Sequence, residues 1–484
     1  MKTNSISKSA AIRERVGHPI LDSDGHMVEM LPVFLDYLKS VAGARLSERF
    51  GNEVADAVIY GGWRSPAGAD YRGARTMRGP WWSCPARNTA DLATAMMPHL
   101  MRARLDEMGL DMSVVYPTLG LLIVNMADAE LRQACARALN RMKADMYRGL
   151  TDRLLPVATI PMHTPAEAIA ELDYAVGQLG IRVVMMAGYV RRPIEAAMRI
   201  SSEAGRHSYW LDTFGIDSEH DYDPVWAKCA ELKVAPTFHS LGYGWGSRTS
   251  PSSYLANHLG NFAASAEAIC RSLLMGGVPV RFPDLRFAFL EGGVAWARNL
   301  YCDLIAHWHK RNREAMENYN PDSIDGALFE RLAAAHGGRM AQGRAGEIVA
   351  AHVRWMKRSA APDAVDEWAQ SGIRSPEDIR DLFTGRFYFG CEGDDPMNAL
   401  AFDTRGAPFG SRLGAFYGSD IGHWDVPDMK DSAEEAYELV EQGLITHEDL
   451  RAFVFENPVR FWTAVNPGFF EGTILEGAAA SLAR

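Results

Sequence analysis

The chain has 484 residues, of which 47% are hydrophobic and 23% charged, ordinary values for a globular protein with a large core. Its net charge of −11 at pH 7 argues against nucleic acid or an anionic membrane as the main partner, because both attract basic surfaces. No apolar run reaches the ~20 residues that span a bilayer, and Met1 to His18 lacks the apolar core of a secretory signal, so a cytoplasmic protein is expected.

Short β-rich runs alternate with amphipathic helical stretches along most of the chain, which is typical of a parallel sheet with helices outside it. Eight runs are expected to be strands: Pro19–Asp22, Met112–Tyr116, Leu154–Ile160, Arg182–Met186, Ala235–Phe238, Arg286–Leu290, Arg386–Cys391 and Ala415–Gly418. Between two of them, Pro165–Leu179 carries an apolar stripe at a 3.6-residue period, as a helix would. The pattern predicts the α/β class and a (β/α)8 TIM barrel, with residues 1–484 forming a single domain.

Three segments between the expected strands are too long for one helix and its loops: Val41–Leu110, Gly188–Val234 and Tyr301–Gly385. Loops that follow barrel strands cover the catalytic face, so these insertions are expected to shape a substrate pocket rather than form separate domains. The first is rich in aromatic residues such as Trp63 and Trp81, which favours an ordered lid or an oligomer contact.

The end of the first expected strand carries Asp24 and His26, where an apolar run gives way to acidic and imidazole groups. Residues two apart in a strand point to the same side, so these two side chains could bind one cation together. An acid two residues before a histidine is also common by chance. A helix N-cap role for the aspartate is the alternative.

His239 and Asp420 follow two further expected strands. A histidine in that position is more often a hydrogen-bonded core residue than a ligand, and an aspartate there often caps the next helix. A barrel nevertheless brings all its strand ends together around one axis. Because they share this position, four residues are candidate metal ligands: His239, Asp420, Asp24 and His26.

Glu291 ends a fourth apolar run and is followed by two glycines, which allow the backbone to approach a ligand closely. A charged group in such a place is costly unless it is paired or bound to a metal. Glu291 is therefore expected to be a metal ligand or a general base, with a salt bridge to an arginine of a lid as the alternative.

With these residues in view, the chain resembles the amidohydrolase superfamily, in the branch of aminocarboxymuconate-semialdehyde decarboxylase and the resorcylate decarboxylases. The resemblance spans roughly residues 18 to 466. It rests on several segments in order: LDSDGHMVE at 21–29, TDRLLPVATIPMHTPAEAIAEL at 151–172, AICRSLLMGGVPVRFPDLRFAFLEGG at 268–293, YGSDIGHWD at 417–425 and FENPVRFW at 455–462.

The resemblance implies that Asp24 and His26 on the first strand, His239 on the fifth and Asp420 on the eighth are metal ligands. Many members carry a histidine base after the sixth strand, and this sequence has Glu291 there instead. Asp24, Glu291 and Asp420 total −3 if ionised, which leaves −1 with one divalent cation and +1 with two. One or two ions of zinc, manganese or iron are thus expected, because two histidines with several carboxylates suit all three metals.

Four further polar residues are candidates for supporting the ligands or meeting substrate. His423 and Asp425 follow the last expected ligand, with surface capping as their alternative. Glu29 is expected to support His26, and Glu392 to contribute to the rim of the pocket.

These residues predict a metal-dependent hydrolase or decarboxylase for a small carboxylated, aromatic or ring-derived substrate, with Glu291, Asp420 and His239 as catalytic groups. A dinuclear non-haem iron oxygenase on the same barrel is one alternative. The other is a non-catalytic companion subunit of an active paralogue, because the first ligand is altered and the usual histidine base is missing. A homodimer is also expected.

Overall fold

The computed structural model describes residues 6–55, 72–73, 77–78, 85–205, 207–242, 244–359 and 365–482. The lid or oligomer contact expected around Trp63 and Trp81 lies outside the described residues. Within those ranges, no helix combines the length and the apolar character that crossing a membrane would require.

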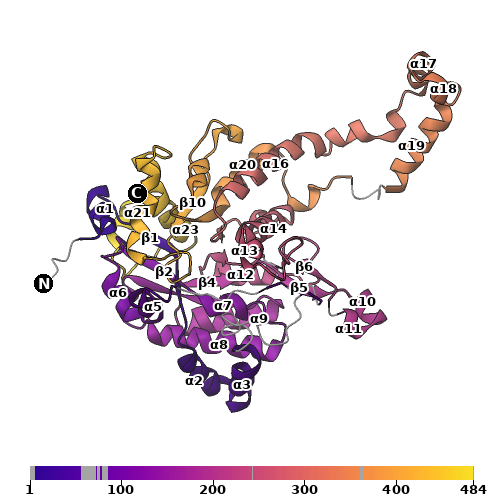
Figure 1. The fold of residues 1–484 in the computed structure, drawn as a ribbon. Helices are drawn as coiled ribbons and strands as arrows, with labels where there is room; N and C mark the ends of the chain where they lie inside the picture. The colour runs from indigo at the N-terminus through magenta and orange to yellow at the C-terminus, as the bar shows by residue number, and fades with distance from the viewer. Residues whose placement is uncertain are drawn as a thin grey trace.

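A parallel sheet of eight strands forms the centre of the molecule, and its strands pair in chain order (Figure 1). They are β1 (Leu21–Met27), β2 (Met112–Pro117), β3 (Leu154–Ile160), β4 (Val183–Met186), β7 (Pro236–Phe238), β8 (Phe287–Phe289), β9 (Phe387–Glu392) and β10 (Gly414–Gly418). The two edges meet where the backbone N–H of Asp420 donates to Asp24 O at 2.9 Å and that of His26 donates to Ile421 O at 2.8 Å. The predicted (β/α)8 barrel and its eight strands are confirmed.

The first strand differs from its predicted span. It was expected at Pro19–Asp22, with the candidate ligands just beyond it, but β1 runs to Met27 and contains both Asp24 and His26. Its pairing with β2 shifts register between Asp22 and Gly25, as at a β-bulge. The ligands therefore sit on a hydrogen-bonded strand rather than on a loop.

Helices follow the strands because their sequences carry both apolar stripes and start signals. In α9 (Pro165–Leu172), for example, the Thr164 hydroxyl accepts from the Glu167 N–H at 3.2 Å, and Pro165 stands at the first helical position. The helix expected to continue to Leu179 does so as a π-helix, η2 (Asp173–Gln178). The larger barrel helices are α8 (Ala129–Met146), α12 (Asp223–Glu231), α14 (Asn261–Met275), α16 (Ala295–Arg311), α20 (Pro376–Arg386), α21 (Ser432–Glu441) and α23 (Asn457–Val465).

Further α-helices lie outside the third insertion. They are α1 (Lys8–Val16), α2 (Leu31–Ala42), α3 (Ala44–Arg49), α5 (Thr89–Met96), α6 (Pro98–Arg104), α7 (Thr118–Ile123), α10 (Glu195–Ile200), α11 (Ser202–Gly205), α13 (Tyr254–His258), α15 (Val278–Arg281), α22 (His447–Arg451) and α24 (Glu476–Leu482).

The second and third insertions have different forms. The second contains an antiparallel hairpin of β5 (Val190–Pro193) and β6 (Tyr209–Asp212). The third continues from α16 into α17 (Gly326–His336), α18 (Gly338–Ala341) and α19 (Ala345–Ser359), which project away from the barrel (Figure 1). This insertion was expected to shape the substrate pocket, but its helices extend outward instead. The assignment of residues 1–484 to one domain stays a prediction.

Candidate metal centre

The five predicted ligands come together at one end of the barrel. Asp24 and His26 lie on β1, His239 directly follows β7, and Glu291 and Asp420 lie two residues beyond β8 and β10. His26 and His239 are fully buried, and the carboxylate side chains are at most 5% exposed. The expectation that a barrel would collect these strand ends therefore holds for all five side chains.

His26 Nε2 is near the middle of the cluster. It lies 3.1 Å from His239 Nε2, 3.4 Å from Asp24 Oδ1, 3.5 Å from Asp420 Oδ1 and 4.0 Å from Glu291 Oε2. His239 Nε2 is in turn 3.0 Å from Glu291 Oε2 and 3.8 Å from Asp24 Oδ1. The potential ligand atoms thus form two overlapping groups. Asp24, His26, His239 and Glu291 make up the first, and His26, Glu291, Asp420 and His423 make up the second.

Several of these atoms lack hydrogen-bond partners among the described residues. Asp24 Oδ1, Glu291 Oε2 and Asp420 Oδ2 are buried and accept no hydrogen bond from a described residue. Buried polar atoms are normally satisfied, and an unpaired buried charge costs several kcal/mol. Imidazole nitrogens and carboxylate oxygens are also the donors preferred by zinc, manganese and iron. The residues present fit a divalent metal ion.

Burial controls the protonation of the cluster. Loss of solvent raises the pKa of Asp24, Glu291 and Asp420 well above the usual range, and neighbouring carboxylates raise it further. The same burial lowers the pKa of His26 and His239 well below the usual range. The imidazoles are therefore neutral, the form that binds metals, and a cation would favour the ionised carboxylates.

The backbone has a positive φ at two of the five positions. Glu291 has φ 56° and Asp420 has φ 48°, in the left-handed region that residues other than glycine, asparagine and aspartate seldom adopt. Such strain persists only where the surrounding structure enforces it, and it gathers at functional sites. Here it turns two carboxylates from the ends of β8 and β10 toward the histidines.

A buried aspartate that the sequence did not single out organises the first strand. Asp22 accepts hydrogen bonds from Asp24 N at 3.2 Å, Ser419 N at 2.9 Å and Ser113 Oγ at 2.5 Å. It therefore joins β1 to β2 and to the end of β10. Gly418 leaves the space that this geometry needs, because a Cβ there would stand 2.7 Å from Asp24 Cβ.

His423 lies against the predicted ligands. Its Nδ1 is 2.6 Å from Asp420 Oδ1, its Nε2 is 3.0 Å from Thr118 Oγ1, and its ring stacks on His26 at 3.9 Å between centroids. With the proton on Nδ1, Nε2 can accept a hydrogen bond from the Thr118 hydroxyl. Burial lowers the pKa of His423 to about 4, so the ring is neutral at pH 7.

The remaining candidates lie in two places. Glu392 and Asp425 have carboxylate oxygens within 4.8 Å of an Asp420 oxygen, and burial raises the pKa of Glu392 to about 8. Glu29 accepts a hydrogen bond from Leu119 N at 2.9 Å, so its expected support of His26 stays a prediction. Its electrostatic neighbour is the buried Lys143, an interaction that the sequence did not predict, and burial brings the pKa of both groups to about 7.

A cavity of about 490 Å³ lies over the loops that follow β2, β3, β4 and β7. Arg191, Tyr189, His163 and Leu241 are among the residues that line it. The neighbouring Arg192 is buried and binds Asp212 at 2.9 Å, which secures the β5–β6 hairpin, whereas Arg191 is exposed and available to a ligand. None of the five clustered residues lines this cavity. It was not predicted, because it depends on the conformation of the second insertion.

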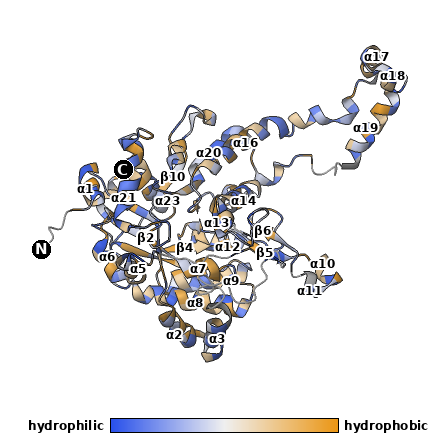
Figure 2. Ribbon diagram, in the orientation of Figure 1, coloured by the Kyte–Doolittle hydropathy of each residue, from blue (hydrophilic) through white to orange (hydrophobic). Residues whose placement is uncertain are grey.

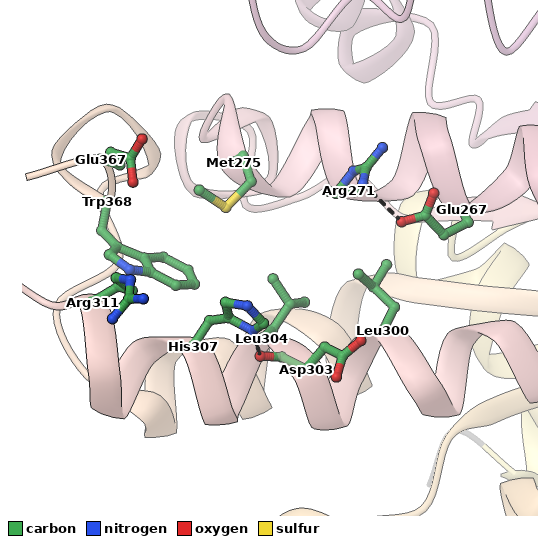
Figure 3. A pocket seen from close by; sticks show the side chains of 10 residues that line it. All are labelled: Glu267, Arg271, Met275, Leu300, Asp303, Leu304, His307, Arg311, Glu367 and Trp368. Atoms are coloured by element: carbon green, nitrogen blue, oxygen red, sulfur yellow. Dashed lines mark hydrogen bonds and ion pairs between the residues drawn. The ribbon is translucent and has the colours of Figure 1, made fainter. Parts of the chain in front are cut away.

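A second cavity, of about 330 Å³, lies between α14 and α16 on the outside of the barrel (Figure 3). Glu267 and Arg271 form an ion pair at 3.3 Å on one side, and Asp303 and His307 line the other. None of the five clustered residues borders this cavity. It is separate from the candidate metal centre.

A (β/α)8 barrel with two histidines and three carboxylates at its strand ends defines a class of metal-dependent barrel enzymes. Comparison with known families specifies the class further. The family model described as amidohydrolase matches residues 98–383, more than half of the chain. The chain belongs to the amidohydrolase family, as its sequence motifs indicated, and it is an enzyme of that superfamily.

Solved structures share the fold at low sequence identity. An amidohydrolase from Mycobacterium avium subsp. paratuberculosis K-10 is 16% identical, with 92% of this chain and 99% of that chain covered and a TM-score of 0.52. A dihydroxybenzoic acid decarboxylase from Polaromonas sp. JS666, with bound manganese and the inhibitor 2-nitroresorcinol, is 13% identical (92% and 97% covered, TM-score 0.48). A 5-carboxyvanillate decarboxylase from Novosphingobium aromaticivorans DSM 12444, with bound manganese, is 11% identical (93% and 98% covered, TM-score 0.48). No curated protein matches the chain.

Proposed function

We propose that this protein is a metal-dependent decarboxylase or hydrolase that acts on a small carboxylated, aromatic or ring-derived substrate. The observation that carries the proposal is that His26, His239, Asp24, Glu291 and Asp420 form two overlapping groups of potential ligands, with buried carboxylate oxygens that no described residue satisfies. The amidohydrolase family assignment agrees with such a site.

In this proposal, Asp24, His26, His239 and Asp420 hold a zinc, manganese or iron ion, and Glu291 completes the cluster. When bound, the ion would polarise a substrate carbonyl or carboxylate, or lower the pKa of a water molecule to about 7. His423 orients Asp420 through its Nδ1 contact at 2.6 Å.

Glu291 is the proposed proton carrier of the site. It takes the place of the histidine base that many superfamily members have, and its Oε2 is 3.0 Å from His239 Nε2. Burial and the neighbouring carboxylates raise the pKa of this carboxyl well above its usual range, so it can hold a proton that an exposed glutamate would have lost. Glu291 would thus take a proton from a nucleophile or deliver one to the carbon that loses a carboxyl group.

Arg191 supplies the proposed recognition of a substrate carboxylate. Its side chain is exposed, lines the cavity of about 490 Å³ and packs over the Tyr209 ring at 5.0 Å. An arginine forms two parallel hydrogen bonds with a carboxylate, which fixes both affinity and orientation. A ring-sized acid fits this volume.

Metal analysis with two ligand variants tests the proposal. Protein purified without chelators should contain a divalent metal and convert members of a panel of hydroxylated aromatic acids and cyclic amides. His239→Ala and Asp420→Asn should lose both metal and turnover, whereas the control Asp322→Asn, with a 70% exposed side chain, should lose neither. A His239→Ala or Asp420→Asn protein that keeps its metal and full activity would refute the assignment.

A dinuclear iron oxygenase is the second candidate, and one observation favours it. Two groups of potential ligands overlap. The first is Asp24, His26, His239 and Glu291, and the second is His26, Glu291, Asp420 and His423. Two ions would also balance three carboxylates better than one. This function requires about two irons per chain and oxygen uptake with a reductant, so one zinc or manganese per chain would count against it.

The third candidate, a companion subunit without activity, rested on the altered first ligand and the missing histidine base. In the structure, Asp24 and Glu291 both point into the cluster, so neither change leaves a gap among the ligands. Turnover by the purified chain alone would exclude this candidate.

A further inference from the structure

Three carboxylates meet beside the metal centre, at the ends of β9 and β10. Glu392 is the last residue of β9 and pairs in register with Gly418 of β10, two residues before Asp420. Asp425 follows Asp420 after a short turn. One carboxylate oxygen from each of Glu392, Asp420 and Asp425 lies within 4.8 Å of the other two. These three residues are called here the carboxylate triad.

The backbone around the triad is held in place by close contacts. Asn398 Nδ2 donates to Glu392 O at 2.7 Å, which fixes the end of β9. After Asp420 the chain turns back at Gly422, which has φ 100° and where a Cβ would stand 2.7 Å from His26 O. The triad is therefore built into the ends of two strands.

Two oxygen atoms of the triad are buried without a partner among the described residues. The Asp420 side chain is only 4% exposed, and its Oδ2 accepts no hydrogen bond there. Asp425 Oδ1 is likewise buried and unpartnered. A buried carboxylate oxygen is costly unless a positive group or a proton satisfies it. The two atoms thus indicate that a ligand of positive charge belongs beside them.

The charges around the triad increase the need for a cation. In the part of the chain that the structure describes, no lysine or arginine forms an ion pair with Glu392 or Asp425, and Glu392 interacts electrostatically with Asp394 and Asp395. His258 is a neighbour of Asp425, but burial lowers the pKa of its ring, which is therefore neutral at pH 7. The metal centre has three carboxylates and the triad adds two, so one divalent cation leaves −3 and a second leaves −1.

The ligand atoms specify the kind of cation. All three groups of the triad offer oxygen only, whereas the metal centre also offers two imidazoles. Carboxylate oxygens suit Mg²⁺, Mn²⁺ and Ca²⁺, and imidazole suits zinc and iron. Glu392 and Asp425 are half-buried, so an ion at the triad can keep some of its water molecules, as these cations often do.

We propose that Glu392, Asp420 and Asp425 bind a second divalent cation, of the oxygen-preferring kind, beside the metal centre. Asp420 is shared, since it also belongs to one of the two ligand groups described above. The proposal depends on the metal centre only through that residue, and not on the reaction catalysed there. It differs from the dinuclear candidate, whose two ligand groups contain neither Glu392 nor Asp425.

Manganese binding to the full chain tests the site. Metal-free wild type should bind about two Mn²⁺ per chain, counted from the electron paramagnetic resonance signal of the unbound ion. Glu392→Gln/Asp425→Asn should bind one and keep its circular dichroism spectrum, and each single substitution should weaken the second ion about tenfold or more. The matched control Asp303→Asn/Glu367→Gln removes the same charge at exposed acids of the separate cavity in Figure 3 and should still bind two.

Terbium luminescence separates this site from the metal centre. Protein loaded with one zinc per chain should bind Tb³⁺, an oxygen-preferring probe that tryptophan sensitises, and Trp424 directly precedes Asp425. Glu392→Gln/Asp425→Asn should lose this luminescence, whereas His239→Ala should lose the zinc and keep the luminescence, so failure of either site is distinguishable. At most one Mn²⁺ per wild-type chain, two in the double variant, or equal luminescence in the wild type and the double variant would each overturn the proposal.

Discussion

Replacement of His423 by alanine tests whether this histidine positions a metal ligand. The ring contacts Asp420 Oδ1 at 2.6 Å on one side and Thr118 Oγ1 at 3.0 Å on the other. Without it, the Asp420 carboxylate loses the partner that fixes its rotamer, although the carboxylate itself remains. Loss of such a supporting contact typically lowers metal affinity or activity by about 10- to 100-fold, or about 1.4 to 2.7 kcal/mol.

The dissociation constant for zinc or manganese should be measured by competition with a fluorescent chelator, together with the number of ions bound at saturation. His423→Ala should weaken binding within that range and leave the number of ions unchanged. The matched control Thr118→Val removes the hydroxyl but retains the side-chain shape, and it should weaken binding less because the imidazole still contacts Asp420.

Two results would contradict this reasoning in different ways. An unchanged dissociation constant would show that Asp420 is held without His423. Loss of one of two bound ions would show that His423 is itself a ligand, as the group of His26, Glu291, Asp420 and His423 permits, and would favour the dinuclear candidate.

Four more changes have defined expectations. Gly418→Ala should lower metal affinity about tenfold or more in the same competition assay, because the added Cβ would lie 2.7 Å from Asp24 Cβ. Gly477→Ala, whose added Cβ meets no atom within 4 Å, is the control. Arg191→Gln should raise the KM for a carboxylated substrate about tenfold or more with a smaller effect on kcat, and an unchanged KM would place carboxylate binding elsewhere. Lys143→Met should cost about 3 kcal/mol in urea unfolding by leaving Glu29 buried without its cation, and adding Glu29→Gln should recover part of that loss. Burial and neighbouring carboxylates raise the pKa of Glu435 from 4.5 to about 7. Its contribution to stability is therefore present below pH 4.5 and is lost as the pH rises through 7. Glu435→Gln should raise the Tm at pH 8 by about 2 °C and leave the Tm at pH 4.5 unchanged.

The barrel was predictable because its strands are buried on both faces and read as short apolar runs. Glu291 was predictable for a related reason, since a carboxylate at the end of such a run has no place in a core unless it has a function. The spacing of Asp24 and His26 also gave the correct side of the strand, although the strand proved longer than expected.

Other features depend on contacts between distant segments and could not be read from local patterns. Asp22 looks like an ordinary acid at a strand end, and its role appears only when Ser113 and Ser419 lie beside it. The electrostatic interaction of Lys143 with Glu29 links a helix and a strand end more than 100 residues apart. Arg191 and the helices α17 to α19 belong to insertions, whose direction follows from tertiary packing rather than from periodicity.

The left-handed backbone at Glu291 and Asp420 has a consequence for protein engineering. Glycine and asparagine adopt such φ values more easily than glutamate does, so they would relax the chain at the end of β8, and glycine would do the same at the end of β10. A library selected for heat resistance alone would drift toward those residues and yield tougher proteins without a place for a cation. These two positions therefore show, by sequencing alone, whether a directed-evolution experiment has kept chemistry or exchanged it for rigidity.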